Sequence, residues 1–253
     1  MAIVTGRVAV RPRDYVRVSG PDAQDFLQRM VSNDVASGDV VDALLLTAKA
    51  RVIAALRIWR RGTDDFLLLT DRGRGEPVQQ ALLRARFAAR VEIAPEEHSA
   101  LVVFGGEGGI PNADYGEPAV ELLDSDADVT VDADELERLR IEAGTPAWGK
   151  EIDDRVLPAE AGLVERAVSF TKGCYPGQEP IARLHHRGHV NRRLRVLDVD
   201  GEAAPEAEIR HGEKVVGRVT SAVPGLALAY VRVEVPEDAD LDVAGVHARM
   251  RPA

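Results

Sequence analysis

The sequence is poor in cysteine: its 253 residues contain a single thiol, Cys174. One cysteine cannot form an internal disulfide. It also cannot supply the several thiolates that a structural zinc site or an iron–sulfur cluster requires. We therefore expect no metal site built from the thiols of this chain alone.

Long hydrophobic runs are missing as well. No stretch approaches the ~20 consecutive apolar residues that a membrane-spanning helix needs. Residues 1–20 include Arg7, Arg11, Asp14 and Arg17 and lack the apolar block of a secretory signal. We expect a soluble, cytoplasmic protein without a membrane partner.

Positive charge is scarce overall but concentrated in one segment. The formal net charge of −10 argues against strong direct binding of nucleic acid. Residues 166–195, however, hold seven Arg or Lys residues and a single acid, Glu179, together with His185, His186 and His189. This basic segment is either a site for an anion or a solvated surface, and composition does not decide between the two.

Hydrophobic periodicity predicts an α+β protein that ends in a small antiparallel β-barrel. Strand-like runs occupy residues 16–18, 40–46, 52–59, 66–70 and 101–104, and residues 105–109 form a glycine-rich loop. Helical patterns begin at Pro21 and cover residues 78–87, 134–143 and 161–168. Residues 111–128 are expected to form a loop and one short strand. Five short strand-like runs, at 194–199, 207–211, 215–219, 226–235 and 243–250, then predict the barrel. We expect the domains to be 1–195 and 196–253.

Residues 170–179 form a loop punctuated by glycine and proline that carries the thiol. Gly173 and Gly177 would let the backbone approach a ligand closely. Lys172 could favour the thiolate of Cys174. The other interpretation is equally simple: free cysteines are usually small buried hydrophobes, and glycines often only permit a turn.

Residues 172–179, which read KGCYPGQE, resemble the signature of the folate-binding YgfZ family, and seven of its eight positions match. The likeness continues through Ala182-Arg183, Arg187-Gly188 and Arg192-Arg193-Leu194. Blocks at residues 18–34, 140–151, 158–160, 216–221 and 227–232 are similar to others of the same superfamily, which includes the glycine-cleavage T-protein. Residues 95–130 match weakly.

The resemblance implies three subdomains around a central folate funnel, with the β-barrel at the C-terminus. The cofactor would be tetrahydrofolate or a one-carbon or polyglutamylated derivative. A carboxylate could accept hydrogen bonds from the pterin edge. Glu151 and Glu160 are the candidates, Glu151 being preferred for its place in the motif, although either could instead cap a helix or pair with an arginine. The other implied binding residues are Gly173, Tyr175, Gly177, Gln178, Glu179, Arg183 and Arg187, with Cys174 as a functional thiol assisted by Lys172.

One departure from the resemblance bears on activity. T-proteins carry an Asp-Asp pair on the strand that corresponds to residues 51–57, where this sequence has Ala54 and Ala55. Without that carboxylate, proton control at the folate nitrogens is lost.

Three hypotheses follow. The first is a folate-binding accessory protein that works with iron–sulfur proteins or their assembly factors and affects tRNA modification indirectly. The second is an aminomethyltransferase or other one-carbon transferase, against which the missing pair argues. The third is a folate-binding scaffold without chemistry. Whether the chain is an enzyme stays open.

Overall fold

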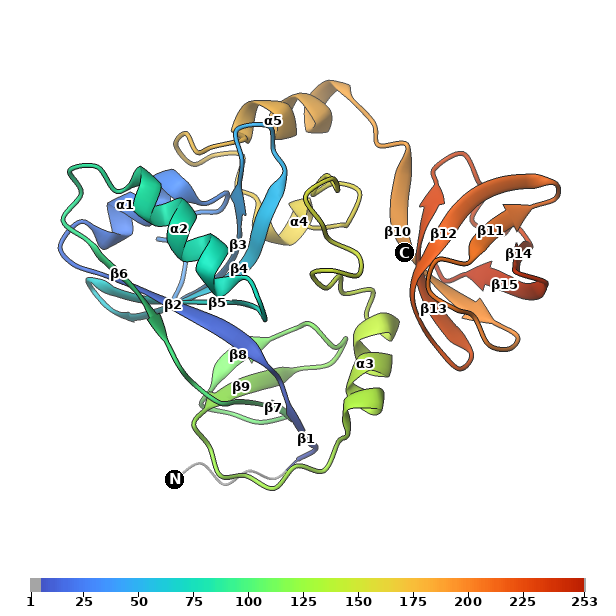
Figure 1. Ribbon diagram of the computed structural model, residues 1–253, viewed down its shortest axis with the longest axis horizontal. Helices are drawn as coiled ribbons and strands as arrows, with labels where there is room; N and C mark the ends of the chain where they lie inside the picture. Colours follow the sequence, from blue (N-terminus) through green and yellow to red (C-terminus); the bar gives the residue numbers. More distant parts are fainter. Residues whose placement is uncertain (1–5, 253) are drawn as a thin grey trace.

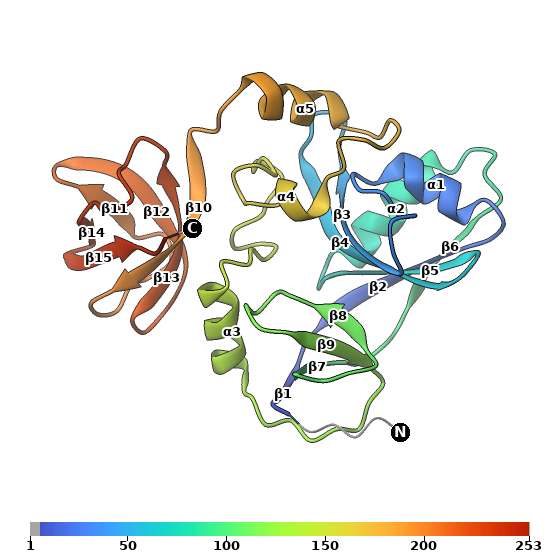
Figure 2. The ribbon, with the colours of Figure 1, turned by 180° about the vertical axis from the view of Figure 1, so that it is seen from behind.

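The computed structural model describes residues 6–252 and contains two sheets, a closed barrel and five helices. The views from both sides show the barrel at one end of the molecule, with the two sheets at the other end (Figures 1 and 2). Helix α3 and residues 144–168 lie between these parts. The predicted α+β class and the C-terminal barrel are confirmed.

The first sheet has the strand order β3-β4-β5-β2-β6. Its strands are β2 (Arg13–Ser19), β3 (Val40–Leu46), β4 (Val52–Gly62), β5 (Asp65–Asp71) and β6 (Glu92–Glu96). Because side chains alternate along a strand, Ala54, Leu56 and Ile58 of β4 pack on the face that α1 and α2 cover. Ala55 and Arg57 point to the opposite face, toward the middle of the molecule.

Helices α1 (Ala23–Met30) and α2 (Gly75–Ala85) begin and end differently from the prediction. Asp22, not Pro21, is the residue directly before α1. The predicted second helix is too long, because the chain leaves it after Ala85. Phe87 has a left-handed backbone with φ of 40°, and its side chain is 91% exposed.

The second sheet has the order β1-β7-β9-β8, with strands β1 (Val8–Val10), β7 (Ala100–Phe104), β8 (Ile110–Asn112) and β9 (Ala119–Leu123). β1 and β2 follow each other in sequence but belong to different sheets, so the chain itself joins the two sheets. The expectation of one short strand in 111–128 is wrong, since β8 and β9 pair there. Helix α3 (Ala133–Glu142) lies beside this sheet and also packs on the barrel.

Between α3 and the barrel lie two further helices, α4 (Val164–Ala167) and α5 (Gln178–Arg187). The predicted helix 161–168 shrinks to α4, because Gly162 adopts a left-handed φ of 68° that a continuous helix does not allow. Helix α5 was not predicted. Its first turn contains Pro180, which is tolerated there because that turn needs no amide donor.

The barrel is closed, with the order β10-β13-β12-β11-β14-β15. Its strands are β10 (Arg192–Val199), β11 (Glu208–His211), β12 (Lys214–Val223), β13 (Leu226–Arg232), β14 (Leu241–Val243) and β15 (Val246–Met250). The run 243–250 is a hairpin and not one strand, because Ala244 and Gly245 both have positive φ and turn the chain. β10 begins before the predicted division at 195/196, and that division stays a prediction. Within residues 6–252, no helix is long and apolar enough to cross a membrane.

Candidate functional site

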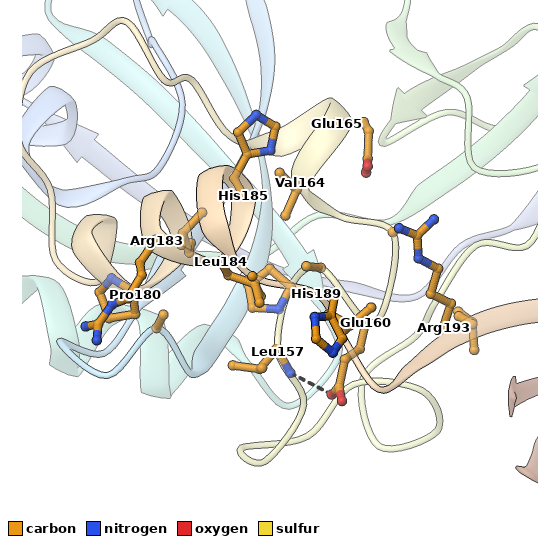
Figure 3. A pocket seen from close by; sticks show the side chains of 18 of the residues that line it. Leu157, Glu160, Val164, Glu165, Pro180, Arg183, Leu184, His185, His189 and Arg193 are labelled. Atoms are coloured by element: carbon orange, nitrogen blue, oxygen red, sulfur yellow. Dashed lines mark hydrogen bonds between the residues drawn. The ribbon is translucent and has the colours of Figure 1, made fainter. Parts of the chain in front are cut away.

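A cavity of about 820 Å³ lies between α5, residues 157–165 and the start of β10. Figure 3 shows its walls: Leu157, Val164 and Leu184 are apolar, whereas Glu160 and the arginines form the polar part. Its volume is in the range of small-molecule and cofactor sites. Three of the predicted binding residues, Glu160, Arg183 and Arg187, line it.

The cavity is basic. Arg183, Arg187 and Arg193 are exposed, and in the described part of the chain no carboxylate lies within ion-pair distance of any of them. Figure 3 shows Arg183 and Arg193 on opposite sides of the pocket. Arginines without a partner in the protein are available to a carboxylate or phosphate of a ligand.

Two carboxylates line the cavity, Glu160 and Glu165. Glu165 is exposed, whereas the side chain of Glu160 is only 13% exposed. Its Oε2 accepts a hydrogen bond from the Leu157 amide at 3.1 Å, and its Oε1 accepts one from Nε of Arg192, also at 3.1 Å. A second bond from Arg192 to Oε2 is longer, 3.4 Å. A carboxylate has about four acceptor positions, so Glu160 keeps capacity for a ligand.

Glu151 has a different environment from the one that the motif suggests. Its side chain is fully buried. Oε2 accepts hydrogen bonds from Arg140 at 2.8 Å and from the Ala147 amide at 3.0 Å, and Oε1 accepts them from Ser221 at 2.6 Å and Thr220 at 2.8 Å.

Arg140, Ala147 and Ser221 are thus committed to the Glu151 carboxylate, and the single hydroxyl proton of Thr220 is shared between it and the Leu228 carbonyl, also at 2.8 Å. The carboxylate thereby joins the turn after α3 to barrel strand β12. These contacts favour Glu160 over Glu151 as the candidate pterin partner, and the role of either glutamate stays a prediction.

Lys172 is also placed differently. Its ammonium donates to the carbonyls of Gln28, Val31 and Asn33 at 2.5, 2.7 and 3.0 Å. These carbonyls lie at the end of α1, where helical carbonyls lack intrahelical partners. Burial lowers the pKa of Lys172 to about 8. The predicted role beside Cys174 is corrected: all three N–H bonds hold the loop against α1.

The glycines of the motif serve the fold of the loop. Gly177 has a φ of 84°, and a Cβ there would lie 2.7 Å from the Thr47 carbonyl oxygen. Its close approach is thus to the β3–β4 turn and not to a ligand. A Cβ at Gly173 would meet nothing within 4 Å. The predicted contact of these glycines with a ligand stays a prediction.

The remaining residues of the motif separate into buried and exposed ones. Tyr175 packs in the core beneath the loop, and burial raises the pKa of its hydroxyl. Gln178 and Glu179 begin α5, where Glu179 complements the positive end of the helix dipole. None of these three lines the cavity. Cys174 is exposed.

The face of β4 that carries Ala55 borders a second cavity of only about 40 Å³, close to a cluster of buried charges. Arg57 donates to Asp114 at 3.1 Å and to Glu121 at 3.1 Å, and Arg13 donates to Glu121 at 2.6 and 2.8 Å. We call these four residues the buried ion network.

Burial alone would raise the pKa of Asp114, but the charges of Arg57 and Arg13 outweigh it and hold that pKa below its ordinary value. The carboxylates near Ala55 are thus committed to arginines. Around Ala55, therefore, none of these carboxylates is free to replace the Asp-Asp pair that T-proteins carry on the corresponding strand.

Arg193 belongs to the segment that carries the resemblance but was not among the binding residues predicted by name, and the apolar wall formed by Val164 and Leu184 was not predicted. Arg193 lies inside the basic segment 166–195, so the concentration of positive charge there could have predicted it as a binding residue. The wall could not be found in this way, because it forms only when α5 folds against residues 157–165.

Comparisons with known proteins agree with the motif. Residues 191–253 match the family described as the CAF17 C-terminal beta-barrel domain. The tRNA-modifying protein YgfZ of Edwardsiella ictaluri is 29% identical, with 78% of this chain and 73% of that protein covered. The mitochondrial iron–sulfur cluster assembly factor IBA57 homolog of Pyricularia oryzae is 26% identical, with 93% and 74% covered.

The fold has a close structural counterpart as well. The crystal structure of the glycine cleavage system aminomethyltransferase T from Bartonella henselae superimposes with a TM-score of 0.83 at 19% identity, covering 98% of this chain and 86% of that one. Sequence motif, relatives and the T-protein-like fold together support the resemblance of this chain to the YgfZ family of the T-protein-like superfamily.

Proposed function

We propose that the protein binds tetrahydrofolate in the cavity beside α5 and acts as an accessory factor for iron–sulfur proteins, with an effect on tRNA modification. The names of its relatives support the second part, since one is a tRNA-modifying protein and another an iron–sulfur cluster assembly factor. The observation that carries the folate proposal is the composition of the cavity. It combines a largely buried carboxylate with spare acceptor capacity, Glu160, with apolar walls and with arginines that have no carboxylate partner among residues 6–252.

Each part of a reduced folate has a matching group in this cavity. The pterin edge presents N–H donors, which Glu160 can accept. Leu157, Val164 and Leu184 provide apolar surface for the rings. The glutamate tail is anionic and suits Arg183, Arg187 or Arg193. Folate bound here would supply the one-carbon chemistry, and the side chains of this chain would bind and orient it.

The alternative, aminomethyl transfer in the manner of the T-protein, has less support. Ala55 occupies the position where the resemblance expects a carboxylate, and the neighbouring acids of the buried ion network are held by arginines. We propose instead that the exposed thiol of Cys174 serves a partner protein, because a side chain on the surface is accessible to another molecule.

Two experiments test the proposal. Calorimetric titration with tetrahydrofolate should show one site per chain, and the absence of heat and of any binding signal would overturn the folate part. Expression in an Escherichia coli strain that lacks its own YgfZ should restore the modified nucleosides of tRNA. The Cys174→Ala variant should bind folate normally yet fail to restore them. Full restoration by Cys174→Ala would remove the thiol from the function.

A further inference from the structure

Phe87 is the most exposed large apolar side chain among residues 6–252, with 91% of its surface accessible. It lies in the loop between α2 and β6, and its φ of 40° is in the left-handed region that a bulky side chain rarely adopts. This backbone costs conformational energy, and the exposed ring gains nothing from burial within the chain. The stability of the isolated chain therefore does not explain a phenylalanine at this position.

A cavity of about 450 Å³ lies directly beside Phe87, between α1 and the loop that follows α2. Its apolar part is formed by Phe26, which is buried, and by Met30 and Ala89, which pack partly buried against the core of the first sheet. The loop from α2 to β6 lies at the end of the molecule away from the barrel in both views (Figures 1 and 2). The cavity beside α5 is lined by other residues, so the two surface features are separate.

The rim of this cavity carries free charges of both signs. Asp25, Arg29 and Arg86 line it and are exposed, and none of the three makes an ion pair with another of the described residues. Asp22 differs, because it already pairs with Arg90 at 2.9 Å. A rim with both signs suits a surface that meets a copy of itself, since the acid of one copy can face an arginine of the other. A rim of one sign would repel its copy.

We propose that this face binds a second copy of the chain, with the Phe87 side chain of each copy in the cavity of the other. A twofold dimer uses the same patch of both copies. Because Phe87 and the cavity are adjacent, the exchange closes after two copies and does not propagate into a filament. A phenylalanine buries about 150–250 Å², so the two rings supply much of a small contact area, and the dimer belongs to the weak class of interfaces.

The first test is sedimentation velocity of the full chain over a range of concentrations. The wild-type protein should show a monomer–dimer equilibrium with a dissociation constant of about 10 µM, as expected for a small interface. A protein that stays monomeric at roughly twenty times that concentration would overturn the proposal.

Phe87→Asn separates binding from folding, because asparagine adopts a positive φ more readily than phenylalanine does. It should weaken the dimer about 30-fold, equivalent to ~2 kcal/mol, the effect of a central aromatic contact. Its urea midpoint, measured at a concentration where the wild type is monomeric, should not fall. The matched control is Val129→Asn, since Val129 is 51% exposed and lies outside the cavity. Equal dimerisation of the two variants, or a loss of stability in Phe87→Asn without a loss of dimer, would overturn the proposal.

An exchange of charges tests whether the partner is a second copy. Asp25→Arg makes the free charges of the rim all positive, and the double variant Arg29→Asp with Arg86→Asp makes them all negative. Each variant alone should stay monomeric where the wild type dimerises, because like charges then face each other. An equal mixture of the two should form a heterodimer, and this heterodimer should weaken as salt rises. A mixture of folded variants that stays monomeric would show that the two rims do not meet, and would overturn the proposal.

Discussion

Two arginine-rich regions of this molecule lie on either side of residues 163–167, and they differ in whether the charges are paired. In the buried ion network, Arg13 and Arg57 are almost fully enclosed and contact Asp114 and Glu121. In the cavity beside α5, Arg183, Arg187 and Arg193 are exposed and have no carboxylate partner in the described chain. The first region leaves a space of about 40 Å³, and the second one of about 820 Å³.

The difference shows that positive charge alone does not identify a site. A buried arginine must be neutralised by nearby carboxylates, because an unpaired buried charge costs several kcal/mol. The arginines of the network therefore hold the two sheets together. An exposed arginine needs no partner to be stable, so its charge remains available for a ligand.

Removing a cation from the buried ion network should lower the stability of the protein more than the other changes predicted below. Arg57→Met keeps most of the buried volume but leaves Asp114 and Glu121 without one of their two main cations. We expect a loss of about 3–5 kcal/mol in the free energy of unfolding, measured by urea denaturation.

The control is Arg193→Met, whose exposed side chain makes no ion pair in the described residues and which should change stability by less than ~0.5 kcal/mol. Similar losses of unfolding free energy in Arg57→Met and Arg193→Met would show that pairing with carboxylates does not make the buried arginine more important for stability than the exposed one.

Glu151→Gln should have the next largest effect. The amide would keep one oxygen acceptor, so its NH2 group would face either the N–H donors of Arg140 and Ala147 or the hydroxyls of Ser221 and Thr220, which now donate to the carboxylate. We expect a loss of about 1.5–3 kcal/mol in unfolding free energy, the worth of a hydrogen bond to a charged group. An unchanged urea midpoint would show that the carboxylate is not needed to join the barrel to the turn after α3.

Lowering the pH should reduce the contribution of the buried ion network to the free energy of unfolding. In the folded protein the pKa values of Asp114 and Glu121 lie below their ordinary values, despite burial, because of Arg57 and Arg13. Their contribution to stability is therefore complete above the unfolded-state pKa values of about 4, and it is lost as the pH falls below them.

Unfolding free energies measured from pH 7 down to about 3 should show this decline. Asp114→Asn removes one of the two carboxylates and should make the decline shallower by roughly 1–2 kcal/mol over the range. A decline of the same size in Asp114→Asn would place the acid sensitivity elsewhere in the molecule.

The sequence predicts much of the fold because its local patterns are strong. The runs at 40–46 and 66–70 alternate or are continuously apolar, and they coincide with β3 and lie within β5. Short runs separated by Gly and Pro predict the barrel. Some predicted ends of helices and strands were wrong. They lie near residues with a positive φ, such as Gly162, Phe87 and Ala244, and hydrophobic periodicity does not reveal such backbone conformations.

The candidate site is less predictable, because a motif records which residues matter and not what they contact. The segment 172–179 marks an important loop, yet Lys172 and Gly177 secure that loop against α1 and the β3–β4 turn. Glu151 and Glu160 look equivalent in the sequence. Only the fold shows that four donors surround one of them and that the other faces a cavity.

The most direct test is therefore the affinity for tetrahydrofolate of Glu160→Gln and Glu151→Gln, compared by calorimetry on variants shown to be folded. The proposed site requires Glu160→Gln to bind about ten-fold more weakly, or ~1.4 kcal/mol, because the pterin edge loses its charged acceptor. Glu151→Gln should bind as the wild type does, although it is less stable. The opposite result, normal binding by Glu160→Gln and weak binding by Glu151→Gln, would contradict the assignment of the cavity beside α5.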